Sequence, residues 1–263
     1  MYTELVEKFC TIPKLPITSF DTKAISSVKR FEIDFDDKTI QCYEWGEGKT
    51  ILLAHGWGSR ASHMALLAKQ LSEAGFHVVA FDAPGHSSIN EFKETNYSSM
   101  FEFCMTISAV GKKISPVYAI VGYSLGAASS AVIAAGQKQF NNYKLEIEKL
   151  VLISSPLSIA GLIKSFCRNN NLSAEDVYKL ETELQKEFNF SIEDYLTSDA
   201  VKMFDKKILL VHDSEDEEIP VEEAKEIASS SSKLKTFYTN GYGHYKILTN
   251  RNMIAEVKKF LIE

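Results

Sequence analysis

A serine flanked by glycines follows an apolar segment near the middle of the chain. Residues 117–121 are Val-Tyr-Ala-Ile-Val, and Gly122-Tyr-Ser124-Leu-Gly126 and a run of small residues come next. This pattern is typical of a strand that turns sharply into a helix, with the serine hydroxyl exposed on the turn. Glycine at 122 and 126 leaves out side chains where the two backbones must pass close together. We interpret Ser124 as a candidate catalytic nucleophile.

A base is the first partner that such a serine needs, because its hydroxyl is a weak nucleophile until its proton is accepted. The base is usually a histidine, which a carboxylate holds in one tautomer and orientation. With a serine on this kind of turn, the acid and then the histidine follow it along the chain, each in a loop after a strand. His244 fits, because it lies in a glycine-rich loop after the last predicted strand, which ends at Tyr238.

The acid is expected within residues 212–220, which follow another apolar strand and read His-Asp-Ser-Glu-Asp-Glu-Glu-Ile-Pro. An acidic run of this kind is often no more than a solvated loop, and catalysis needs only one of its members. Asp213, Glu215 and Asp216 are the candidates, and the residues alone leave the choice among them open. His55, His86 and His212 are interpreted as structural residues that support loops.

The elements that would position these residues alternate between short apolar strands and amphipathic helices. Two early strands are predicted to form an antiparallel hairpin at a sheet edge, and the later ones are typical of parallel strands covered on both faces. The pattern predicts the α/β class, with a mostly parallel central sheet and helices on both faces. The predicted strands are 28–35, 39–45, 50–54, 76–82, 117–121, 149–154, 207–212 and 233–238, and the predicted helices are 62–74, 96–113, 126–137 and 253–262.

One insertion interrupts this alternation. Residues 156–205 carry only helical patterns, and they are too many for a plain connection between strands. We predict that they form a small helical cap over the carboxyl ends of the strands. Residues 1–155 and 206–263 would then form the core domain. The first 27 residues stay unassigned, apart from a helical spacing over residues 2–9.

The motifs together resemble those of the α/β-hydrolase superfamily, in particular its capped esterase, lipase-like and serine-aminopeptidase-like branch. The similarity extends from Ile51 to the C-terminus. Residues 55–59 (HGWGS) are similar to the His-Gly loop of the family, and residues 81–88 (FDAPGHSS) to its Asp-x-Pro-Gly-His-Gly-x-Ser segment. Residues 212–220 are similar to its His-Gly-x-x-Asp-x-x-Val-Pro segment. Ser87 and Asp213 replace family glycines, which bears on loop conformation and leaves the catalytic positions intact.

The resemblance implies an α/β-hydrolase fold and a Ser124–Asp216–His244 triad. It also implies that the backbone N–H groups of Trp57 and Leu125 form an oxyanion hole. We therefore expect a serine hydrolase that cleaves a small or medium carboxylic ester through an acyl-enzyme on Ser124, with no cofactor or metal. A peptidase or a thioesterase with the same triad is an alternative, and so is a non-catalytic ligand-binding protein of this fold.

Composition excludes several other classes. The 263 residues have a net charge of −6, which gives no general attraction to nucleic acid or to an anionic membrane. The expected partner is the small-molecule acyl substrate that the resemblance implies. No window approaches the ~20 apolar residues of a membrane span. Four scattered cysteines and the lack of a signal-peptide pattern favour a cytoplasmic location. The sequence leaves the oligomeric state open, a homodimer included.

Overall fold

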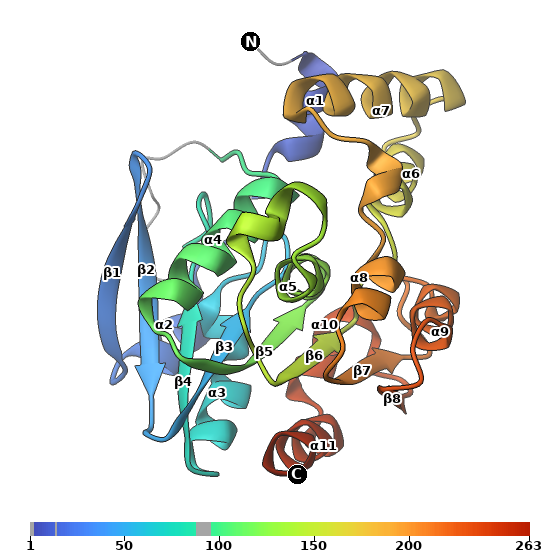
Figure 1. Cartoon of the computed structure of the whole chain (residues 1–263). Coiled ribbons are helices and arrows are strands. Elements are labelled where there is room, and N and C mark those ends of the chain that lie inside the picture. Colours follow the sequence, from blue (N-terminus) through green and yellow to red (C-terminus); the bar gives the residue numbers. More distant parts are fainter. Residues whose placement is uncertain (1–2, 14, 88–95) are drawn as a thin grey trace.

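A computed structural model describes residues 3–13, 15–87 and 96–263 of the chain (Figure 1). Across these residues the strands form one eight-stranded sheet, in the order β1-β2-β4-β3-β5-β6-β7-β8. The strands are β1 Lys29–Phe35, β2 Lys38–Trp45, β3 Lys49–Ala54, β4 Phe76–Phe81, β5 Val117–Tyr123, β6 Lys149–Ile153, β7 Lys207–Asp213 and β8 Leu234–Thr239. Each lies where the sequence pattern predicts a strand, with ends that differ by one or two residues.

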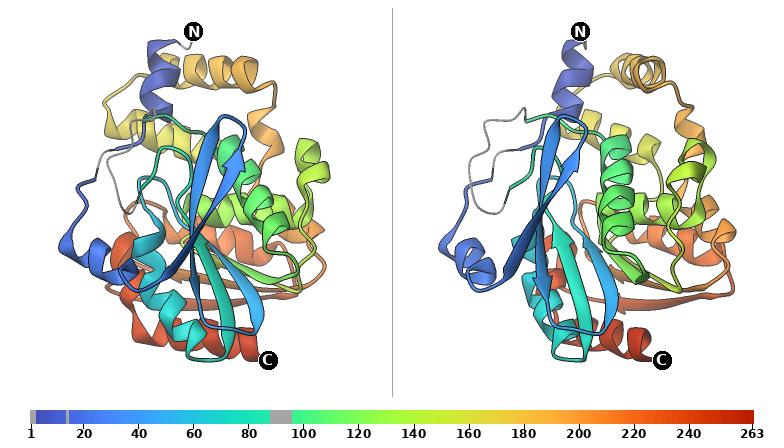
Figure 2. Two further views of the ribbon diagram at one scale, coloured as in Figure 1. Left: turned by 90° about the vertical axis from the view of Figure 1, so that its left-hand side faces the viewer. Right: turned by 60° about the vertical axis from the view of Figure 1, so that its left-hand side comes forward.

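The pairing of the strands confirms a mostly parallel sheet with a hairpin at one edge. β1 and β2 are antiparallel, as are β2 and β4, and every other neighbouring pair is parallel (Figure 2). Parallel strands direct their carboxyl ends to the same edge of a sheet. The loops that follow β3, β5, β7 and β8 therefore emerge together, which is the arrangement that a site built from several loops requires.

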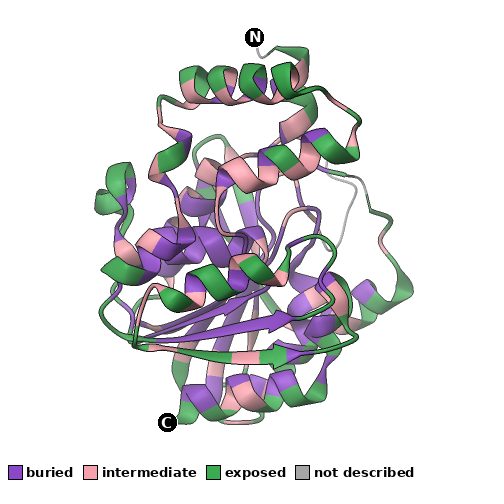
Figure 3. Cartoon of the chain, turned by 90° about the vertical axis from the view of Figure 1, so that its right-hand side faces the viewer, coloured by how far each residue is buried: buried purple, intermediate pink, exposed green. Residues whose placement is uncertain are grey.

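Two helical layers cover the sheet, and alternate side chains of each central strand face one layer or the other. In β3, Leu52 and Ala54 pack toward one layer, whereas Ile51 and Leu53 pack toward the other. The first layer contains α4 Met100–Lys113, α5 Leu125–Ala135, α8 Thr197–Met203 and α9 Val221–Ser229, and the second contains α2 Ser19–Ile25, α3 Ala65–Ser72 and α11 Arg251–Ile262. Figure 3 shows buried strands between helices whose outer faces are exposed. This double cover explains the continuous apolar runs in the sequence.

Residues 156–205 are helical, as predicted. α6 Ile159–Asn169 begins where Ser158 accepts a hydrogen bond from a backbone N–H, and α7 Ala174–Phe188 begins with a capping box. A short η3 helix, Ile192–Asp194, and α8 follow, and α8 packs against α5 beside the sheet. Figure 1 places α6 and α7 farther out, beyond the carboxyl ends of the strands. The extent of a separate cap stays a prediction.

The N-terminal region contains helices that the sequence patterns did not fully identify. α1 Glu4–Cys10 agrees with the helical spacing over residues 2–9, of which residue 2 lies outside the described part. Its neighbour in space is α7, and the two lie side by side in Figures 1 and 2. The hydroxyl of Thr3 donates a hydrogen bond to the carboxylate of Glu183 on α7. α2 and α9 were not predicted.

Candidate active site

Ser124 occupies a strained turn between β5 and α5. Its φ of 54° and ψ of −125° lie outside the regions that residues with a side chain ordinarily adopt. The neighbouring glycines explain how the turn fits, because a Cβ on Gly122 would lie 2.5 Å from the Cα of Ala127. A Cβ on Gly126 would lie 2.2 Å from the carbonyl oxygen of His55. The turn thus holds the Ser124 hydroxyl at the carboxyl edge of the sheet.

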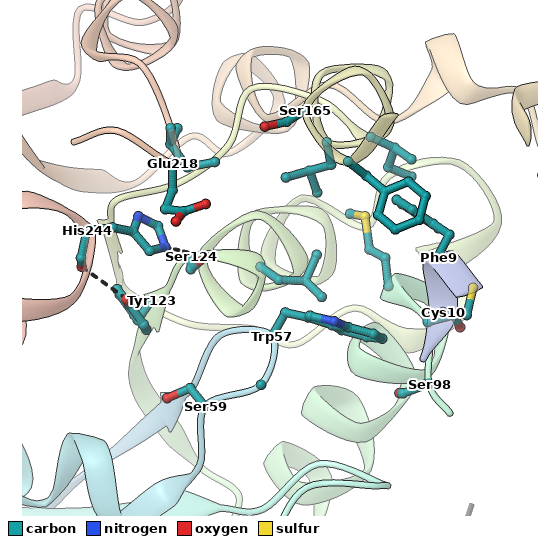
Figure 4. A pocket seen from close by; sticks show the side chains of 18 of the residues that line it. Phe9, Cys10, Trp57, Ser59, Ser98, Tyr123, Ser124, Ser165, Glu218 and His244 are labelled. Atoms are coloured by element: carbon teal, nitrogen blue, oxygen red, sulfur yellow. Dashed lines mark hydrogen bonds between the residues drawn. The ribbon is translucent and has the colours of Figure 1, made fainter. Parts of the chain in front are cut away.

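His244 lies between Ser124 and Asp216, at the start of α10 Gly243–Lys246. Its Nε2 is 3.0 Å from the Ser124 Oγ (Figure 4). Its Nδ1 is 2.8 Å from the Asp216 Oδ2. Because an ionised carboxylate only accepts hydrogen bonds, Nδ1–H donates to Asp216. Nε2 is then free to accept the proton of the serine hydroxyl.

Asp216 is buried, and both oxygens of its carboxylate accept hydrogen bonds. Oδ1 accepts hydrogen bonds from the backbone N–H groups of Glu218, at 3.0 Å, and Ile219, at 2.9 Å, which leaves Oδ2 for His244. Burial raises the pKa of Asp216, but the hydrogen bond and charge of His244 and the Ile219 N–H outweigh it and hold that pKa below its usual value. Asp216 is therefore ionised at neutral pH.

The rival acids have other partners. Asp213 accepts hydrogen bonds from the backbone N–H groups of Glu215, at 3.0 Å, and Tyr242, at 3.1 Å, and so ties the loop after β7 to the loop after β8. The carboxylate of Glu215 is exposed and accepts a hydrogen bond from a side-chain amide in the second loop. Asp216 is thus the member of the acidic run that the structure brings to His244.

The loop after β3 passes directly over Ser124. A Cβ on Gly56 would lie 2.7 Å from the Ser124 Cβ, so only glycine fits there. No described residue accepts a hydrogen bond from the backbone N–H of Trp57 or of Leu125. Each of these donors belongs to a residue that adjoins this contact. Their use as an oxyanion hole stays a prediction.

Two buried histidines hold this loop in place, as their structural interpretation predicts. His55 Nε2 accepts a hydrogen bond from the N–H of Ala83, at 3.0 Å, and its Nδ1 donates to the carbonyl of Gly56, at 2.7 Å. His86 Nε2 accepts from the N–H of Gly58, at 3.0 Å. Both rings act as neutral imidazoles, because each needs one nitrogen without a proton. Ser88, the last residue of the matched motif, lies outside the described residues.

Because these two histidines are buried in the neutral form, we expect the protein to lose stability in acid. Burial lowers the pKa of His86 from the ordinary 6.5 to about 4, and it lowers the pKa of His55 too. The unfolded chain therefore takes up protons that the folded chain refuses as the pH falls from 6.5 towards 4. Between about pH 7.5 and pH 5, His86 alone should lower the free energy of unfolding by about 2 kcal/mol. Urea unfolding at both pH values measures this loss. His86→Gln should remove that contribution, and an unchanged pH dependence in this variant would contradict the prediction.

A cavity of about 530 Å³ opens beside Ser124 and His244. Its walls come from the loop after β3, from the amino-terminal ends of α4 and α5, and from α6, α7 and α1. Trp57 lines it, whereas Phe9 and Cys10 on α1 had no sequence signal that would place them there. Burial raises the pKa of the Cys10 thiol to about 11. Over the described ranges, no set of three or more His, Cys, Asp or Glu side chains could hold a metal ion, and no helix could span a bilayer.

A family profile identifies the family, and similar solved structures share the fold. The profile of the "Alpha/beta hydrolase family" matches residues 51–245, which is more than half of the chain. An esterase of Pyrococcus furiosus is similar in structure, with 18% identity, a TM-score of 0.68, and coverage of 96% of this chain and 97% of that one. Est1E from Butyrivibrio proteoclasticus has 20% identity, a TM-score of 0.62, and coverage of 89% and 97%. A thioesterase domain from the curacin biosynthetic pathway has 18% identity and a TM-score of 0.63, and the match covers 90% of this chain and 100% of that one. No curated protein sequence matches the chain.

Proposed function

Because the chain belongs to the alpha/beta hydrolase family, we propose that it is a serine hydrolase that cleaves a carboxylic ester through an acyl-enzyme on Ser124. The observation that carries the proposal is the unbroken chain of contacts from the Ser124 Oγ through His244 to Asp216, at 3.0 Å and 2.8 Å. A protein that only binds a ligand has no need of a base within hydrogen-bonding distance of a serine on a strained turn. An ester is preferred to other acyl compounds by analogy with the similar esterase of Pyrococcus furiosus.

The first half of the reaction forms the acyl-enzyme. As the Ser124 Oγ attacks the carbonyl carbon of the ester, His244 Nε2 accepts the hydroxyl proton. The negative charge of Asp216 stabilises the resulting imidazolium, and the carbonyl oxygen becomes an oxyanion. The N–H groups of Trp57 and Leu125 would donate to that oxyanion, each contributing about 3 kcal/mol to stabilisation of the transition state. The C–O bond then breaks, and His244 gives its proton to the departing alcohol.

The second half releases the acid and restores the enzyme. Water takes the place of the alcohol, and His244 Nε2 accepts one of its protons as its oxygen attacks the acyl carbon. When the second tetrahedral intermediate collapses, the bond to the Ser124 Oγ breaks and His244 returns the proton to that oxygen. One ester and one water thus give one carboxylic acid and one alcohol, and no cofactor takes part.

Labelling with a fluorophosphonate probe tests the proposed nucleophile. The probe phosphonylates serines that an adjacent base activates, so the wild-type protein should be labelled and Ser124→Ala should not. Matched p-nitrophenyl esters and thioesters then compare the two substrate classes. We expect faster turnover of the ester.

A control variant separates loss of the nucleophile from loss of the fold. Ser229→Ala removes an exposed hydroxyl on α9, and it should be labelled like the wild type. A wild-type protein that stays unlabelled, under conditions in which a reference serine hydrolase reacts, would refute the proposed function. Faster turnover of thioesters would keep the triad and replace the substrate class.

A further inference from the structure

The cavity extends to both sides of Ser124, and we call these two sides its arms. Figure 4 shows His244, Tyr123 and Glu218 on one side, and Phe9 and Cys10 at the far end of the other. If the proposed reaction holds, His244 must protonate the leaving oxygen, and the alcohol therefore lies on the His244 side. The acyl chain would then lie in the opposite arm.

The opposite arm, which we call the acyl arm, is lined mainly by apolar side chains, and Ser98, Ser165 and Asn169 are polar residues of the same cavity wall. The described cavity residues on α1, α4, α5, α6 and α7 include no charged side chain. The indole of Trp57 lies between Ser124 and the end of the arm (Figure 4). The apolar side chains of these helices that line the arm are Phe9, Met100, Phe101, Leu125, Ile159, Leu162, Phe166, Leu184 and Phe188. A linear hydrocarbon chain is the ligand that such a lining favours.

Two aromatic pairs form part of the wall of the arm, and the pair that includes Phe9 lies at its far end (Figure 4). The ring of Phe9 on α1 meets that of Phe166 on α6 edge to face, with centroids 5.2 Å apart. Phe101 on α4 stacks on Phe188 on α7, with centroids 5.3 Å apart and planes inclined by 9°. Pairs of this kind add about 1 kcal/mol beyond the burial of their area, so the wall keeps its shape. The contact of α1 with α7 holds Phe9 over the end of the arm.

We propose that the acyl arm binds the unbranched acyl chain of a medium-chain fatty acid ester, and that the Phe9–Phe166 pair sets the upper limit of its length. The proposal rests on the proposed function, because it uses Ser124 as the point of attachment. At roughly 30 Å³ for each non-hydrogen atom, the cavity of about 530 Å³ holds on the order of 15 to 20 such atoms. Shared between the arms, this space fits an acyl chain of roughly eight to ten carbons and a small alcohol.

A series of p-nitrophenyl esters measures the arm directly, because the leaving group stays constant while the acyl chain grows. From acetate through butyrate to octanoate, kcat/KM should rise by up to about fourfold for each methylene that enters the arm. Beyond octanoate or decanoate it should fall, since further carbons meet the Phe9–Phe166 pair. The value for hexadecanoate should lie well below the maximum.

Two variants with opposite effects test the role of the pair. Phe9→Ala opens the end of the arm and should raise the ratio of kcat/KM for dodecanoate to that for butyrate by about tenfold or more. Phe166→Trp fills the end and should lower the same ratio below that of the wild type. Tyr178→Ala is the matched control, because it removes an aromatic ring from α7 that is 72% exposed and outside the cavity. Its ratio should equal that of the wild type.

The outcomes separate this inference from the proposed function. Fluorophosphonate labelling of each variant reports whether the Ser124 site is still assembled, and the wild-type profile stands even if Phe9→Ala does not fold. A wild-type protein that is labelled but has its highest kcat/KM with acetate would overturn the acyl arm and leave the triad intact. Equal dodecanoate-to-butyrate ratios of kcat/KM in wild type, Phe9→Ala and Phe166→Trp would also overturn the acyl arm and leave the triad intact. An unlabelled and inactive wild type would refute the proposed function itself.

Discussion

Replacing Ser124 with alanine is expected to lower kcat for a p-nitrophenyl ester by about 10⁶-fold, the size of loss typical when a triad loses its nucleophile. The variant keeps His244 and the N–H donors of Trp57 and Leu125. A residual acceleration of about 10³- to 10⁴-fold over the uncatalysed reaction should therefore persist. Steady-state kinetics with active-site titration of the wild type measure the difference, and circular dichroism checks that the variant is folded.

Ser165→Ala is the matched control for this experiment. Ser165 is a half-buried residue that lines the same cavity from α6, and Figure 4 places it away from His244. Its loss should leave kcat within a fewfold of the wild-type value, because no base accepts a proton from its hydroxyl. If Ser124→Ala retained a tenth of wild-type kcat, another group would have to be the nucleophile.

The sheet could be predicted from sequence because most of its strands have a recognisable local pattern of apolar residues. The strands from β3 to β7 are covered on both faces and read as short apolar runs, whereas the edge strand β8 is more exposed and more polar. The order of the catalytic candidates along the chain followed from the same pattern, since Ser124 and Asp216 come just after such runs and His244 follows the last strand. Hydrogen bonding of His55 and His86 to loops confirms the structural interpretation of these residues.

The resemblance to the family motif favoured Asp216 among the acids, and the structure shows what the rival Asp213 does instead. Asp213 is the last residue of β7, and its carboxylate binds the N–H of Tyr242 and the hydroxyl of Thr239 from the β8 side. Asp216 lies three residues later, beyond a turn, and faces His244 instead. Both aspartates sit in the same acidic run, so the choice of Asp216 from the sequence depended on the match of residues 212–220 to the family motif.

The residues that line the acyl arm could not be predicted from the sequence. α1 has seven residues, and an isolated helix of that length is unstable in water. Its apolar side chains find partners only when α6 and α7 are in place, as the contact of Phe9 with Phe166 illustrates. Contacts between segments so far apart in sequence leave no periodic signal. The lining of a cavity is therefore harder to predict than the strands around it.

Asp216→Asn should lower kcat by about 10⁴-fold and change KM little. The reason lies in the partners of the carboxylate. Oδ1 accepts the N–H groups of Glu218 and Ile219, so the asparagine oxygen must stay there and its NH₂ group must face His244. An NH₂ group donates to Nδ1 and moves the ring proton to Nε2, which can then no longer accept from Ser124. The charge that stabilises the imidazolium is lost as well. Steady-state kinetics on a p-nitrophenyl ester measure both constants.

Asp213→Asn makes the same chemical change three residues away and should act on stability instead. The Asp213 carboxylate accepts from the N–H groups of Glu215 and Tyr242 and from a hydroxyl on β8, and an amide NH₂ would oppose one of these donors. A lost bond with a buried donor left unsatisfied costs about 1–3 kcal/mol of the free energy of unfolding. The folded variant should keep kcat within about tenfold, because His244 retains its contact with Asp216. A 10⁴-fold loss in Asp213→Asn, together with an active Asp216→Asn, would instead make Asp213 the functional acid.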